Sequence, residues 1–151
     1  MTVEKNAAIV DDDGEQRLIY REFLEELGFR VDDVGSVAEL SRPEYVLALV
    51  DMVFKDQENA RERVDGPEFC SQLRRKFPRC LIIAMSSVAD QDVLKDAVTT
   101  GACAMFRKED VRLRTLREYL RLHWCCWHPD DPDGQLAFHR RMHEAVFGTV
   151  R

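Results

Sequence analysis

The sequence lacks any long run of apolar residues. No stretch approaches the roughly 20 consecutive apolar residues that a membrane-spanning helix needs, so we expect no membrane segment. The polar N-terminus also argues against a secretory signal peptide. An excess of positive charge is absent as well, because 28 acidic residues outnumber 22 basic ones and give a net charge of −6. Indiscriminate binding of the whole molecule to nucleic acid is therefore not expected.

The cysteine pattern gives no sign of pairing. The five cysteines stand at positions 70, 80, 103, 125 and 126, an odd number with irregular spacing. This excludes a disulfide framework and favours the reduced thiols of a cytoplasmic protein. At 151 residues, 45% of them apolar, the chain is long enough for one domain with its own core.

Short apolar runs alternate along the chain with stretches of helical periodicity. The expected strands are 8–10, 29–34, 45–50, 81–85 and 104–107, and the expected helices are 14–27, 36–40, 66–77, 90–100 and 110–123. Residues 54–64 are polar and charged and are expected to form a loop. The alternation predicts an α/β fold over residues 1–123, a (βα)5 doubly wound unit whose five-stranded parallel sheet is covered on both faces. Residues 124–151 would form a C-terminal extension with one helix.

Three of the expected helices carry an apolar stripe that the fold should bury. The stripes are Ile19, Phe23 and Leu27, then Phe69, Leu73 and Phe77, and finally Leu113, Leu116 and Leu120.

Polar side chains follow four of the expected strands at the point where each strand ends. Asp11 and Asp12 follow the first strand, Asp51 the third, Ser86 the fourth and Lys108 the fifth. In an open parallel sheet the carboxyl ends of the strands share one edge, where ligands bind. Carboxylates that lie close together repel each other unless a cation lies among them, and hard oxygen ligands suit Mg²⁺. The sequence therefore predicts a crevice that binds Mg²⁺ and, through it, a phosphate.

These motifs, in this order, resemble the receiver domain of bacterial two-component response regulators, the CheY-like fold. The resemblance covers residues 7–123 and depends on Val10-Asp11-Asp12, Val50-Asp51, Met85-Ser86-Ser87, Gly101-Ala102 and Phe106-Arg107-Lys108. The steps from Ser86 to Gly101 and from Gly101 to Lys108 also match the family. The resemblance implies the flavodoxin-like strand order 2-1-3-4-5.

The resemblance also implies a role for each residue. Asp51 would accept a phosphoryl group from phosphohistidine on a sensor histidine kinase or a phosphotransfer protein. Asp12, Asp51 and the backbone carbonyl of Val53 would bind Mg²⁺ directly, and Asp11 would act through water. Lys108 would contact the incoming phosphoryl oxygens, and Ser86 would donate a hydrogen bond to the attached group. The protein would then be a phosphoacceptor that assists its own phosphorylation and dephosphorylation, not an enzyme with a separate substrate.

Several positions depart from the family pattern. The segment between Asp51 and Gly66 is about twice the usual family length and lacks the usual proline. Met105 stands where many receivers have a switching tyrosine or phenylalanine, and Glu109 follows Lys108 in place of proline.

Two alternative functions remain open at this point. The first is a degenerate receiver that is never phosphorylated and serves as a protein-binding scaffold. The second is a small Mg²⁺-dependent phosphohydrolase of the haloacid-dehalogenase type, which also uses an aspartate nucleophile. That class needs a second acid two residues after the nucleophile, and Val53 occupies that position here.

The segment after residue 123 is rich in large apolar side chains and in cysteine and histidine. A stripe of Phe138, Met142 and Val146 predicts an amphipathic helix that packs on the domain or on a second subunit. Zinc binding is the alternative, with candidate ligands Cys125, Cys126, His128, His139 and His143. If the protein is a receiver, we expect it to signal through contacts with a downstream protein or through a homodimer formed by the last helices or the extension.

Overall fold

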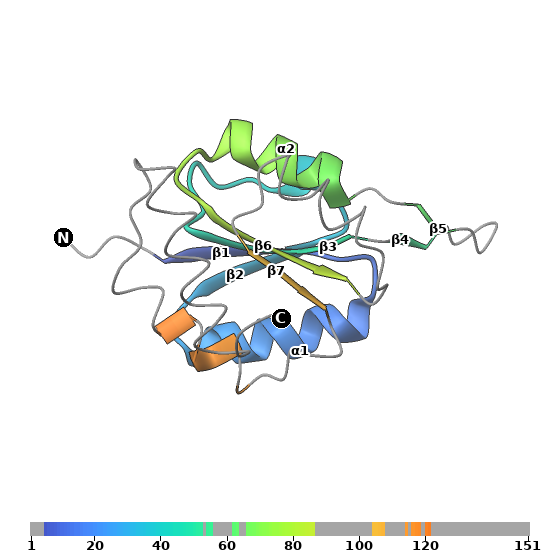
Figure 1. Ribbon diagram of the computed structural model, residues 1–151. Coiled ribbons are helices and arrows are strands. Elements are labelled where there is room, and N and C mark those ends of the chain that lie inside the picture. Colours follow the sequence, from blue (N-terminus) through green and yellow to red (C-terminus); the bar gives the residue numbers. More distant parts are fainter. Residues whose placement is uncertain are drawn as a thin grey trace, which may run out of the picture.

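The computed structural model describes residues 5–52, 54–55, 62–63, 66–86, 104–107, 114, 116–118 and 120–121. Its centre is a five-stranded parallel sheet in the order β2-β1-β3-β6-β7 (Figure 1). The strands are β1 (Asn6–Val10), β2 (Arg30–Val34), β3 (Leu47–Asp51), β6 (Leu81–Ser86) and β7 (Ala104–Arg107). The predicted fold class and strand order are confirmed. The first strand begins earlier than predicted, at Asn6.

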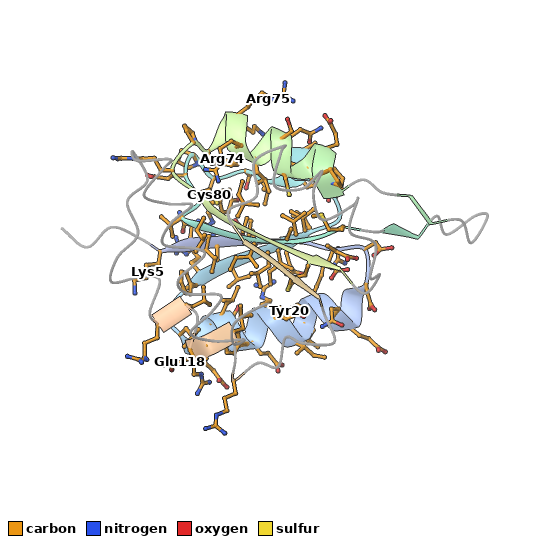
Figure 2. The ribbon with its side chains drawn as sticks, viewed as in Figure 1. Lys5, Tyr20, Arg74, Arg75, Cys80 and Glu118 are labelled. Atoms are coloured by element: carbon orange, nitrogen blue, oxygen red, sulfur yellow. The ribbon has the colours of Figure 1, made fainter. Side chains whose placement is uncertain are left out.

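The sheet has an apolar core on each face, because successive residues of a strand point to opposite sides. Figure 1 shows α1 (Gly14–Glu26) over one face and α2 (Gly66–Lys76) over the other. The strand residues on the α2 side include Ala8, Val10, Ala48, Val50, Ile82 and Ala84, and those on the α1 side include Ala7, Ile9, Leu47, Leu49, Leu81 and Ile83. Side chains fill both interlayer spaces (Figure 2). Burial on both faces explains why the central strands are continuous apolar runs.

Helix α1 begins where the sequence predicts, but its buried stripe differs from the prediction. Asp13 is its N-cap, and the side chain of Asp13 accepts hydrogen bonds from the backbone N–H groups of Glu15 and Gln16. Gly28 follows the helix with a φ of 94°, which favours glycine. The buried stripe is Tyr20, Phe23 and Leu24, whereas Ile19 is 47% exposed.

The assignment of Ile19 to the core was therefore wrong. Each residue turns the helix by 100°, so a stripe that steps by four residues drifts around the axis. The apolar residues at Tyr20, Phe23 and Leu24 follow the spacing i, i+3, i+4, which keeps them on one face. The predicted stripe of the next helix agrees better with the structure. Leu73 of α2 is buried, Phe69 is half-buried, and Phe77, which directly follows α2, is buried.

The segment from 54 to 64, predicted as a loop, contains a two-stranded antiparallel ribbon. Strand β4 (Phe54–Lys55) pairs with β5 (Glu62–Arg63) in the register Phe54↔Arg63 and Lys55↔Glu62. The ribbon extends away from the sheet (Figure 1). The prediction missed the ribbon because the segment has no apolar alternation to indicate strands.

Gly66, the first residue of α2, lies directly against the end of β3. Its N–H donates to the Met52 carbonyl oxygen at 3.1 Å, and Met52 N–H donates to the Met85 carbonyl oxygen at 2.9 Å. A Cβ added at Gly66 would lie 2.7 Å from the Asp51 carbonyl oxygen and closer still to Met52 Cα. The start of α2 can approach the sheet this closely because residue 66 has no side chain.

Tyr45 connects the edge strand β2 to the chain that precedes β3. Its hydroxyl donates to Asp32 Oδ2 at 2.7 Å, and Arg42 Nε donates to the same oxygen at 2.8 Å. Tyr45 itself is fully buried and contacts the Phe77 ring edge-on at 5.0 Å. Burial raises the pKa of the Tyr45 phenol, and its hydrogen bond to Asp32 raises it further.

Two predicted elements fall outside the described residues, namely the helix at 90–100 and the extension at 124–151. Of the predicted helix 110–123, residues 114, 116–118 and 120–121 are helical. Leu116 and Leu120 are buried, as predicted, while Leu113 is outside the described part of the chain. Within that part, none of the helices has the length and apolarity needed to cross a bilayer.

Adding a single methyl group at Gly66 should destabilise the fold. The new Cβ in Gly66→Ala would meet backbone atoms that cannot rotate away, so we expect a loss of about 3 kcal/mol in the free energy of unfolding. Gly35→Ala is the matched control, because the nearest atoms to its new Cβ are side-chain atoms at 3.7 and 3.8 Å. Urea unfolding of both variants tests this, and equal small losses would contradict it.

Replacing Tyr45 with phenylalanine should reduce stability in a pH-dependent way. At neutral pH the variant loses the hydrogen bond to Asp32, which we expect to lower the free energy of unfolding by about 1.5 kcal/mol. Because the folded pKa of Tyr45 is raised, the parent protein loses this contribution as the pH rises past about 10, where the unfolded phenol ionises first. The difference between parent and variant should therefore shrink above that pH. Urea unfolding from neutral to alkaline pH measures it, and a constant difference would contradict the assignment.

Candidate functional site

Three aspartates meet at the carboxyl end of the two central strands. Asp11 and Asp12 directly follow β1, and Asp51 is the last residue of β3. The two strands are neighbours, with Val10 opposite Val50. One carboxylate oxygen from each of the three aspartates lies within 4.8 Å of the others. The parallel register therefore brings together residues that are about 40 positions apart in the sequence.

The turn after β1 is held by its own backbone and by the carboxylate of Asp11. Asp11 N–H donates to the Val34 carbonyl oxygen at 3.1 Å, which extends the pairing of β1 with β2 by one residue. Asp11 Oδ1 in turn accepts a hydrogen bond from Asp13 N–H at 2.9 Å. Asp13 then caps α1. Asp13 is not one of the three clustered residues.

The cluster is electrostatically demanding because it is mostly buried. Asp11 is 1% exposed and Asp51 4%, while Asp12 is half-buried and leaves the cluster open on one side. Two unit charges 4.8 Å apart repel by roughly 3 kcal/mol at an effective dielectric constant of 20. A divalent cation among the three carboxylates would turn this repulsion into attraction. Three carboxylate oxygens with an open side fit the donor set that Mg²⁺ prefers.

Arg17 is a neighbour of the site that the sequence did not single out. It lies on the first turns of α1, and its Nη1 donates to the backbone carbonyl oxygen of Asp11 at 3.3 Å. Its Nε lies 3.5 Å from Asp33 Oδ2 on the edge strand. Arg17 therefore links three elements around the Asp11 turn. Its position one helical turn after the N-cap is the only sequence signal that could have identified it.

Of the other predicted site residues, the structure describes only the backbone of Ser86. Ser86 ends β6, and its backbone lies opposite Arg107 of β7. Asp51 lies opposite Met85, so the backbone of Ser86 is at the same edge of the sheet as the cluster. Lys108, which follows Arg107, and Val53 are outside the described residues. Their predicted roles at the site stay predictions.

Removing one carboxylate should separate metal binding from helix capping. Millimolar Mg²⁺ should raise the melting temperature of the parent protein, because a ligand at 100 times its dissociation constant adds about 2.7 kcal/mol. Asp12→Asn should lose most of this shift and melt higher than the parent without metal, since one repulsive charge is gone. Asp13→Asn is the matched control, because asparagine also caps helices and residue 13 is not in the cluster. An equal loss in both variants, measured by calorimetry, would contradict the assignment.

Comparisons with known proteins agree with the fold. The structure resembles that of a response regulator from Thermotoga maritima at 24% identity and a TM-score of 0.62, covering 79% of this chain and 96% of that one. A CheY-like receiver domain protein from Methanospirillum hungatei matches at 24% identity and a TM-score of 0.67, with coverages of 79% and 92%.

A third structure matches along most of this chain. It is a response regulator protein from Burkholderia pseudomallei with a phosphorylated aspartic acid, a calcium ion and citrate. It is 16% identical with a TM-score of 0.66, and the match covers 97% of this chain and 76% of that one. The comparison with curated proteins gave no match. A family model described as the response regulator receiver domain matches residues 7–121. With that match over most of its length, the chain belongs to the response regulator receiver family.

Proposed function

We propose that this protein is a phosphorylatable receiver that accepts a phosphoryl group on Asp51. The observation that carries the proposal is the cluster itself, in which Asp51 ends a central strand and lies within 4.8 Å of Asp11 and Asp12. Two contacts fix the backbone around Asp51. The N–H of the next residue, Met52, donates to β6, and Gly66 packs against the end of the strand. Such preorganisation favours attack on a bound phosphoryl group.

In the proposed reaction a carboxylate oxygen of Asp51 attacks phosphorus in line with the leaving group. The bond from phosphorus to the imidazole nitrogen of phosphohistidine breaks, and the imidazole leaves with the electron pair. Asp51 becomes an acyl phosphate. Mg²⁺, when bound, neutralises the charge on the phosphoryl oxygens. Transfer of this kind depends mainly on positioning and charge neutralisation.

The remaining roles follow the family pattern. Asp12, Asp51 and the carbonyl oxygen of Val53 would bind the metal, with Asp11 acting through water. Lys108 would contact the phosphoryl oxygens, and Ser86 would donate to the attached group. The matched structure that contains a phosphorylated aspartic acid and a calcium ion supports this combination of metal and acyl phosphate. The donor would be a sensor histidine kinase or a phosphotransfer protein, and a downstream protein would read the phosphorylated state.

Asp51 should become phosphorylated when the protein is incubated with acetyl phosphate and Mg²⁺. Intact-mass measurement should show one added phosphoryl group in the parent and in Asp13→Asn, and none in Asp51→Asn. Chelation of the metal before acetyl phosphate is added should prevent the added mass in the parent and in Asp13→Asn. Labelling of Asp51→Asn at the level of the parent would show that another residue is the acceptor.

The two alternative functions give different results in the same assay. A scaffold that is never phosphorylated would show no added mass in the parent protein under any condition. A phosphohydrolase would release inorganic phosphate through many turnovers without accumulating a labelled protein.

A further inference from the structure

A groove lies between α1 and the final helical segment, which we define as residues 114, 116–118, 120 and 121. Its lining is Ile19, Glu22, Phe23, Glu26, Arg114 and Arg117, and its volume is about 360 Å³. The two sides are joined by buried leucines, because Leu116 and Leu120 belong to the same core cluster as Phe23. In Figure 1 the helical pieces of this segment lie beside α1. The groove is separate from the acidic cluster, since none of its lining residues belongs to that cluster.

The groove combines an apolar side chain with charged walls. Ile19 is 47% exposed, although it lies on the helix that covers one face of the sheet. Glu22 and Glu26 stand on the α1 side and Arg114 and Arg117 on the other. Arg117 bridges the two sides, with its guanidinium 5.7 Å from the Phe23 ring centre and its Nη2 3.5 Å from Glu26 Oε2. Such a surface suits aromatic side chains, because guanidinium groups stack on rings and carboxylates accept indole N–H groups.

The chain itself supplies such side chains immediately after the groove. Arg121 is the last described residue of the final helical segment and lies one turn beyond Arg117. Residues 122–151 follow it, and their large apolar side chains include Leu122, Trp124, Trp127, Leu136, Phe138, Met142, Val146 and Phe147. A segment this rich in aromatic and aliphatic residues is unlike the composition of disordered chains. The connection from Arg121 is short, so docking on this groove restricts the chain less than docking on a remote surface would.

We propose that residues 124–147 dock on this groove and cover Ile19 with their aromatic side chains. The occupant is thus a segment of the same chain, and the interface is intramolecular. The proposal also accounts for Ile19, an apolar residue in the lining that is otherwise half exposed. It is independent of whether Asp51 accepts a phosphoryl group.

Tryptophan fluorescence reports on this docking directly, because Trp124 and Trp127 are the only tryptophans in the chain. In the full-length parent, the tryptophan emission should be blue-shifted relative to free tryptophan and more weakly quenched by acrylamide. Ile19→Asp places a charge in the groove and should shift the emission to the red and raise the quenching constant towards that of free tryptophan. Leu18→Asp is the matched control, because Leu18 is its neighbour, is 55% exposed and does not line the groove. The conservative variant Ile19→Leu should keep the parent emission.

Three results would overturn the proposal. Emission of the parent like that of free tryptophan would show that the segment does not dock, and identical emission of Ile19→Asp and the parent would place it elsewhere. A blue shift that disappears on dilution would show that the groove binds a second copy of the chain. Circular dichroism of each variant checks that α1 remains folded. If Ile19→Asp is unfolded, hydrogen exchange of the parent decides instead, and fast exchange throughout residues 124–147 would overturn the proposal.

Discussion

Mutual repulsion among three carboxylates, two of them buried, is the constraint on which the site depends. Asp11, Asp12 and Asp51 lie within 4.8 Å of one another at the end of a sheet whose central strands are otherwise apolar. Nothing in the hydrophobic core favours this arrangement, so the surrounding fold must hold it. A divalent cation among the three carboxylates would offset this repulsion, and the cluster could hold one.

The fold holds the cluster mainly through backbone contacts. Backbone hydrogen bonds fix Asp11 to β2 and Met52 to β6 on either side of the site. Gly66 allows α2 to begin directly against the strand that ends in Asp51. Arg17 places a positive charge beside the carbonyl oxygen of Asp11, and its contact with Asp33 connects the turn to the edge strand. The backbone that carries the carboxylates therefore has little freedom to move.

The sequence predicts the sheet and the cluster well because both depend on local patterns. Apolar runs such as Leu47 to Val50 locate the strands, and the acids that follow them must share an edge once the sheet is parallel. The exposure of Ile19 could not be predicted, because apolar residues on neighbouring faces of α1 compete and a single apolar residue does not show which face is buried. The ribbon formed by β4 and β5 has no apolar alternation to reveal it. The close approach at Gly66 depends on Met52, a contact between elements that spacing alone does not show.

The groove on α1 is a second surface, and its residues on α1 lie close in the sequence to Asp11 and Asp12 of the acidic cluster. Helix α1 begins at Gly14, directly after the turn that carries Asp11 and Asp12, and it presents Ile19 to the groove within two helical turns. Any segment docked there rests on the helix that directly follows two residues of the acidic cluster. A docked extension and the acidic cluster would therefore share one rigid element.

Chemical trapping of the acyl phosphate tests the central claim most directly. Borohydride reduces an aspartyl phosphate to homoserine, which marks the acceptor residue permanently and can be located by sequencing peptides in a mass spectrometer. After phosphorylation in the presence of Mg²⁺, the account predicts homoserine at position 51 and at no other acidic residue. Homoserine at position 11 or 12, or a phosphoryl group that resists reduction, would contradict it.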